Sequence, residues 1–280
     1  MMMRAAAGRH QLPSIRKQRG VALGVVVWFI AAMALIVSGI VSEARVDTRM
    51  AQLHYFRAQA AAAGDGAINL ALAEQHGRRS SGQRGADRLQ NYQVGPQEVE
   101  IRMIPGGLFV NISTENVQGL RALFNRGAEI ASERGRVWDT SPEVLTRAVV
   151  EFRDGVGRKR GQTFHSPEDF LRVPGVSRGV YDAVRDYITV EGLAGGFGGK
   201  TTETAAKLGQ IEAAMYGEGA MMQGATEHAA ESLRVDAIVT IGDQQWLRRR
   251  WVSLDQGGYS QLPWRFSRTE AARPVLDGAK

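Results

Sequence analysis

The sequence predicts an α+β fold in which a long N-terminal helix, half of it in a membrane, packs on a small antiparallel sheet that carries an inserted all-helical module. First, Gly20–Ser42 contains no charged residue and is followed by apolar residues at helical spacing. Second, period-two alternation occurs before residue 113 and after residue 231. Third, residues 113–190 carry helix-start signals. Strands on both sides of a helical module indicate an insertion into an α+β domain.

The first element is an apolar segment that is long enough to cross a membrane. Val21–Val41 comprises 21 residues, which form a helix of about 32 Å. A secretory signal has an apolar region of only about 7–15 residues. The plain interpretation is therefore an uncleaved anchor that follows a short leader, residues 1–20. The leader is basic and the residues after the span are balanced in charge, so the positive-inside rule places the N-terminus in the cytoplasm.

Composition excludes several classes of function. The net charge of +6 and the pI near 9.9 come mainly from the leader, which holds five basic residues and no acid. Without those five, 30 basic residues face 29 acidic ones, so the remainder does not favour nucleic acid as a partner. The absence of cysteine excludes disulfides, thiolate metal sites and a cysteine nucleophile.

The helical pattern continues beyond the span. Apolar residues recur every three or four positions, at Val46, Met50, Leu53, Phe56, Ala60, Ala63, Ala67 and Leu70. The spacing predicts one helix of about 80 Å that ends near His76, before Gly77. Small residues at Gly64 and Gly66 favour close packing against a sheet or another helix, and they leave open which of the two it is.

Strands are predicted next. Glu98–Met103 alternates, and Pro105-Gly106-Gly107 predicts a turn into a second strand at Leu108–Ile112, so that the two form a hairpin. We assign residues 43–112 to the rest of the helix and these first strands.

Near the other end, residues 231–266 supply the remaining strands. Leu233–Ile241 alternates, Gly242-Asp243 turns, and Gln245–Leu254 returns. Pro263–Phe266 predicts an edge strand, because proline disfavours a central position. Residues 267–280 are expected to be a disordered tail.

The helical module spans residues 113–190. A first helix is predicted over Glu115–Arg126, and serine caps with proline at the first helical position start others at Ser141 and Ser166. Ser177 caps a further helix, and a short strand closes the module. Residues 191–230 form a glycine-rich linker and a segment to which we assign no structure.

The boundary between leader and span carries a family resemblance. Arg16-Lys17-Gln18-Arg19-Gly20 directly precedes Val21, and this pattern resembles the leader of type IV prepilins and type II secretion pseudopilins. The resemblance implies cleavage by the prepilin peptidase between Gly20 and Val21, and methylation of the new terminus. Most members carry Glu at the fifth mature position, where this chain has Val25. K-type minor pseudopilins lack that Glu and sit at the pseudopilus tip.

Two further stretches are similar to K-type sequences. Phe109–Thr114 resembles their junction into a helical domain, and Phe152-Arg153 followed by Phe164–Leu171 resembles a stretch within it. The resemblance implies a pilin-like core with an inserted, sterile-alpha-motif-like domain, in a single-pass protein of the bacterial inner membrane whose C-terminal domain is periplasmic. It implies a non-enzymatic role in protein secretion. The implied partners are other minor pseudopilins, the major pseudopilin, the prepilin peptidase and the inner-membrane secretion platform.

An alternative function comes from Leu171–Ser177, which resembles a helix-hairpin-helix turn. Backbone N–H groups around Gly175 could then meet a DNA phosphate, and nearby cations would add to this contact. These are Arg158, Lys159, Arg160 and Arg178. The alternative is a membrane-anchored periplasmic DNA receptor, and the plain interpretation is the ordinary turn of a sterile-alpha-motif-like module.

Other motifs predict no chemistry. Residues 194–201 fit a relaxed phosphate-loop pattern, but the remaining segments favour antiparallel strands over the parallel sheet that such a loop needs. The five histidines lack metal-ligand spacing, and no catalytic constellation stands out. Some members of the resembling family bind calcium, but no oxygen-rich loop is visible here. We expect no enzyme activity, no metal and no cofactor, with calcium left open.

Overall fold

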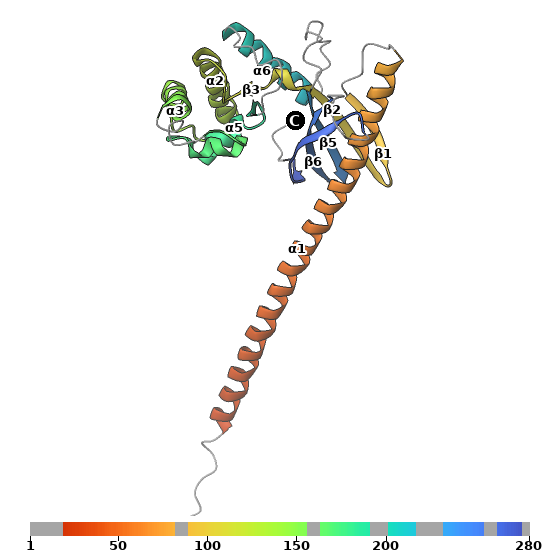
Figure 1. Ribbon diagram of the computed structural model, residues 1–280. Helices are drawn as coiled ribbons and strands as arrows, with labels where there is room; N and C mark the ends of the chain where they lie inside the picture. The colour runs from red at the N-terminus through yellow and green to blue at the C-terminus, as the bar shows by residue number, and fades with distance from the viewer. Residues whose placement is uncertain are drawn as a thin grey trace, which may run out of the picture. The chain divides into compact units, whose positions relative to one another are not determined.

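The computed structural model describes residues 19–81, 89–155, 163–190, 201–216, 232–254 and 262–275. Two compact units are distinguished, residues 1–55 and residues 56–280. Helix α1 (Arg19–Ser80) contributes to both, and Figure 1 shows the course of the chain. The fold is α+β, as the sequence predicts.

The described part of the first unit is helical. Apolar side chains are largely exposed along it, Leu23, Trp28 and Leu35 by about two thirds or more. In the described part of the chain, α1 is the one helix long and apolar enough to span a membrane. The predicted continuation of the helix past the apolar span is confirmed, but the predicted end at Gly77 is wrong, because α1 runs on to Ser80.

The second unit contains an antiparallel sheet in the order β1-β2-β5-β6-β7, and β8 also pairs with β6. Its strands are β1 (Leu89–Val94), β2 (Gln97–Pro105), β5 (Ser232–Ile241), β6 (Gln244–Ser253), β7 (Arg265–Thr269) and β8 (Arg273–Pro274). The chain leaves the sheet after β2 and returns at β5, so the helical module is an insertion between two neighbouring strands.

The strand predictions are partly confirmed. The β5–β6 hairpin turns at Gly242 as expected, with its φ at +58°. The prediction of the first hairpin is wrong, since β2 forms its hairpin with β1 across Gly95 and not with the segment after Pro105. The segment after Pro105 instead forms the short helix η2 (Gly106–Leu108) and β3 (Val110–Asn111), because β3 finds a parallel partner in β4 (Ile188–Thr189).

The tail prediction is also wrong over its first part. β7 and β8 reach residue 274, because both find backbone partners on β6. Ala272 between them is buried in the core that lies under α1. Residues 276–280 lie outside the described part of the chain.

The inserted module has the helices α2 (Val117–Glu133), α3 (Pro142–Asp154), η3 (Pro167–Arg172), α5 (Arg178–Val184) and α6 (Thr201–Tyr216). The predicted cap residues Ser141 and Ser177 accept backbone hydrogen bonds at the starts of α3 and α5. The first module helix begins after Asn116 and is longer than predicted. Helix α6 forms within the stretch that the sequence left unassigned.

Two apolar cores flank the sheet. One joins α1 to the sheet through small residues such as Ala60, Ala63 and Ala67. The other fills the module around Phe124 and Phe170 and reaches Trp251 of β6. Because side chains alternate along a strand, β5 and β6 present one face to α1 and the other to the module.

Candidate functional site: assembly helix and ionic junction

The predicted leader lies at the margin of the described residues. Arg16 and Lys17 lie outside them. Arg19, Gly20 and Val21 form the first turn of α1, and the side-chain description begins at Ala22. The proposed cleavage bond thus sits where the helix starts, and its cleavage stays a prediction.

Val25 lies on an apolar part of α1. Its side chain is 60% exposed, and its neighbours Val26 and Phe29 are also more than half exposed. No acid occurs among the described residues of this part of the helix before Glu43. The helix can therefore enter an apolar environment without burying a carboxylate.

The residues of the DNA alternative are only partly described. Arg158, Lys159 and Arg160 lie outside the described residues. Gly175 has a φ of +84°, and its carbonyl accepts a hydrogen bond of 3.0 Å from Thr140 Oγ1. Arg178 pairs with Asp182 at 3.2 Å and lies 5.4 Å from the ring centre of Tyr181. The charge of Arg178 is thus offset within its own helix.

Strand β6 carries three consecutive arginines, whose side chains make ion pairs on both faces of the sheet. Arg248 donates two hydrogen bonds to Asp65 of α1, at 2.8 and 3.0 Å, and Arg250 donates to the same carboxylate at 2.6 Å. Arg250 also covers the ring of Phe266, as expected for long side chains over aromatic faces. Between them, Arg249 points to the opposite face.

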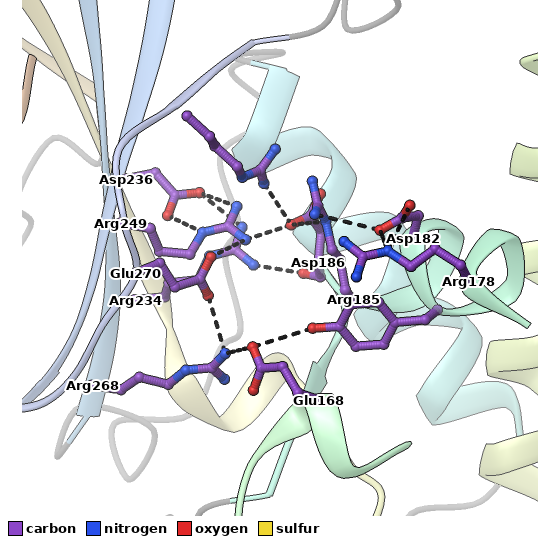
Figure 2. Close-up of polar contacts among 12 residues, drawn as sticks. Glu168, Arg178, Asp182, Arg185, Asp186, Arg234, Asp236, Arg249, Arg268 and Glu270 are labelled. Carbon is purple, nitrogen blue, oxygen red and sulfur yellow. Dashed lines mark hydrogen bonds and ion pairs between the residues drawn. The ribbon is translucent and has the colours of Figure 1, made fainter. Parts of the chain in front are cut away.

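Arg249 is the centre of a set of charges that we call the ionic junction. It is buried, and it donates two hydrogen bonds of 2.7 and 2.9 Å to Asp236 of β5. It also binds Asp186, which follows α5 in the module (Figure 2). Arg234 of β5 lies over the ring of Phe109 at 4.5 Å and donates to the Asp186 carbonyl at 2.6 Å. The junction therefore joins the sheet to the module by side chain and backbone.

An outer set of contacts extends the ionic junction. Arg273 of β8 lies 3.2 Å from Asp186. Arg268 of β7 pairs with Glu168 of η3 at 2.7 Å, and Glu168 also accepts a hydrogen bond from Tyr181 (Figure 2). Arg268 and Arg273, both within the predicted disordered tail, thus hold the module as well as the sheet.

The charges set the pKa values within the junction. Burial alone would raise the pKa of Asp186, but Arg249, Arg273 and Arg234 outweigh it and hold that pKa below its usual range. Burial alone would also raise the pKa of Asp236, but the charges of Arg234 and Arg249 outweigh it and lower that pKa. Burial and the nearby Arg249 lower the pKa of Arg234 to about 10. Both acids are therefore ionised at neutral pH and offset the buried arginines.

Sequence reasoning missed this junction. Arg234 and Asp236 stand at alternate positions of a mostly apolar strand. In an antiparallel sheet this alternation ordinarily indicates a face that meets solvent, so the pattern does not reveal that the module covers it. The covering partner, Asp186, is 50 positions from Asp236, and no local pattern connects the two.

The described residues show no arrangement for metal chemistry. Within ranges 19–81, 89–155, 163–190, 201–216, 232–254 and 262–275, no three His, Cys, Asp or Glu side chains are placed to hold an ion. A cavity of about 150 Å³ lies under the end of α1, between Leu72, Gln75 and Trp264. Of the phosphate-loop pattern, only Thr201 lies within the described residues, at the start of α6.

Comparisons with known proteins find similarity among solved structures. No family model and no curated protein matches the sequence. Among solved structures, the chain is similar to a chain in the crystal structure of the GspK-GspI-GspJ complex from the enterotoxigenic Escherichia coli type 2 secretion system. The identity is 13% and the TM-score 0.45, and the similarity covers 81% of this chain and 99% of the other. At these values the similarity decides neither family nor function.

Proposed function

We propose that this chain is a non-enzymatic minor pseudopilin of the K type, which sits at the pseudopilus tip of a type II secretion system and helps to start pseudopilus assembly for the export of folded proteins. The observation that carries the proposal is helix α1. Its first part is apolar and follows a basic cluster that ends in Gly20, and its later part packs on an antiparallel sheet. The inserted helical module between β2 and β5 supports the same assignment.

The missing acid gives the tip position a physical reason. Cleavage after Gly20 would leave a charged amine at Val21, inside a bundle of apolar helices. In the resembling family, a Glu at the fifth mature position neutralises the amine of a neighbouring subunit, since an unpaired charge in an apolar bundle is costly. Val25 offers no such carboxylate. A subunit without it can occupy the position above which no further subunit is added.

N-terminal sequencing of the membrane-bound form tests the proposal. We expect the mature chain to start at Val21 and to carry a methylated terminus, and we expect Gly20→Ala to block cleavage. Gly24→Ala is the matched control, because Gly24 lies in the same helix with open space around it. A mature chain that starts at Met1, as in an uncleaved anchor, or at Arg45, as after a signal-peptide cut behind Ser42-Glu43-Ala44, would contradict the assignment.

An export assay in the native host tests the role itself. Deletion of the gene, or Gly20→Ala, should leave folded cargo proteins in the periplasm while their passage across the inner membrane continues. Gly24→Ala should export normally. If cleavage is blocked in the Gly20→Ala strain and export is still normal, export does not require the cleaved chain. That result would contradict the proposed role.

The DNA receptor is a second candidate, supported by the turn at Gly175 with its positive φ, followed by the Ser177 cap of α5. The test is binding of the full chain, in detergent, to duplex DNA at several salt concentrations. Neutralising Arg158, Lys159 and Arg160 together should weaken binding and flatten its salt dependence. Binding that stays unchanged would remove this candidate.

A further inference from the structure

The two edges of the sheet differ in how they are protected against pairing with another strand. β7 forms one edge and carries Arg265 and Arg268 among its five residues. Its pairing with β6 is interrupted by a register shift at Trp251 and Val252, and β8 beside it contains Pro274. Charges, irregular register and proline are the devices by which natural sheets prevent pairing at an edge.

Strand β1, at the other margin of the sheet, has none of these devices (Figure 1). Its sequence, Leu-Gln-Asn-Tyr-Gln-Val, contains no charge and no proline, and it pairs with β2 in unbroken register. Within the described residues, β2 is the one strand that pairs with it. In an antiparallel pair every second residue directs its N–H and C=O away from the partner. β1 therefore presents backbone donors and acceptors along an uncharged edge.

An exposed leucine lies beside this edge. Gly66 of α1 approaches Val94, and Glu74 accepts a hydrogen bond of 3.0 Å from the Tyr92 hydroxyl. Leu70 lies one helical turn from each of them, so it belongs to the same line of α1 above β1. Its side chain is 49% exposed. A strand added to β1 would place a side chain against Leu70.

We propose that the outer edge of β1 binds an extended segment of another protein by main-chain hydrogen bonding. The segment is uncharged where it meets β1, because β1 itself carries no charge that could pair with one, and it carries an apolar side chain toward Leu70. This strand addition is a known mode of peptide recognition, in which backbone bonds give affinity and alternate side chains give selectivity. The inference rests on the edge alone and does not depend on the proposed function.

The cysteine-free chain allows a direct test by disulfide tethering. The full chain carrying Asn91→Cys, in detergent, is equilibrated in a glutathione buffer with the neutral peptide acetyl-Thr-Thr-Val-Cys-Val-Thr-Thr-amide, whose valines fall on the α1 side of the added strand. A second peptide has proline in place of the two threonines that lie two residues from its cysteine, which removes two N–H donors that would face β1. We expect the strand peptide to be tethered about tenfold more than the proline peptide, since a few backbone hydrogen bonds of modest net strength give such a factor.

Matched variants keep the test decisive. Thr269→Cys places a thiol on the charged edge, where both peptides should be tethered equally. Gln93→Cys repeats the measurement on β1 if Asn91→Cys lowers the melting temperature. Leu70→Ser should reduce tethering of the strand peptide several-fold and leave the proline peptide unchanged. Equal tethering of both peptides at β1, the same preference at both edges, no effect of Leu70→Ser, or a dominant disulfide between two copies of the chain would overturn the proposal.

Discussion

The two faces of the sheet are covered in different ways. Helix α1 covers one face with small apolar residues, and Gly64 lets the helix approach until a Cβ at that position would lie 2.7 Å from the Cβ of Arg248. The module meets the other side through Arg234, Asp236 and Arg249, three buried charges. The α1 contact thus combines close packing with one partly exposed carboxylate, Asp65, that pairs with Arg248 and Arg250, whereas the module contact buries paired charges that also restrict its geometry.

The difference predicts how each contact fails. Close packing fails gradually, because a few tenths of an ångström of displacement costs only part of the contact energy. A buried ion pair fails abruptly, since the loss of one partner leaves an uncompensated charge away from water. Both contacts use neighbouring residues of β6, and substitutions of their partners on α1, β5 and the module can separate them.

The largest effect is expected from Asp236→Ala. It leaves Arg234 and Arg249 without their shared carboxylate, and removal of one partner of a buried ion pair typically costs about 3–5 kcal/mol. Urea unfolding of the full chain in detergent, followed by tryptophan fluorescence, gives the change in the free energy of unfolding. Asp243→Ala, an exposed acid in the next turn, is the control and should change it by less than about 0.5 kcal/mol. Equal effects would show that the junction contributes no stability.

The next largest effect is expected from Gly64→Ala, which tests the α1 face. The added methyl group would overlap Arg248, and we expect a loss of about 1–3 kcal/mol, as for other overpacked contacts. Gly77→Ala is the matched control in the same helix, with open space around it. It should stabilise the helix by about 0.5–1 kcal/mol. A neutral Gly64→Ala would mean that α1 can move away from the sheet without cost.

The sequence predicts the α1 contact because its cause is local. Ala60, Ala63 and Ala67 recur at the helical period, so the stripe and its small residues are visible without knowledge of any partner. The presence of an inserted module follows in the same way from cap signals such as Ser141. What these patterns leave open is whether the stripe meets a sheet or a helix, and here the structure shows the sheet.

The ionic junction and the first hairpin could not be predicted in this way. Asp186 and Arg249 meet across 63 positions, and an isolated charge does not reveal its distant partner. The polar residues of β1 show no apolar alternation, so the true partner of β2 went unnoticed. The edge strand predicted at Pro263–Phe266 contains the start of β7, but β8 falls in the predicted tail, because Arg273 and Pro274 resemble a polar tail until β6 supplies their backbone partners.

Acid should weaken the junction before it affects the α1 packing. The pKa of Asp186 is held below its usual range by Arg249, Arg273 and Arg234 despite burial. Its stabilising contribution is therefore complete above the unfolded pKa of about 3.9 and is lost as pH falls through the lower folded pKa. After allowance for the 23% exposure of the side chain, we expect Asp186 to account for about 1 kcal/mol of the loss between pH 4 and pH 2. Unfolding at several pH values should show a shallower loss in Asp186→Asn, and an identical slope would contradict the assignment.

The smallest effect is expected from Arg178→Ala, which removes a charged pair from the surface of the module instead of from its junction with the sheet. Arg178 is 68% exposed and its partner Asp182 lies on the same helix, so the free energy of unfolding should fall by less than about 0.5 kcal/mol. Because the fold is left intact, the same variant also tests DNA binding separately from stability. If the turn at Gly175 contacts nucleic acid, Arg178→Ala should weaken duplex binding and reduce its salt dependence at unchanged stability. If the module serves only in assembly, export and stability should both match the unsubstituted chain, since a solvated pair within one helix contributes to neither.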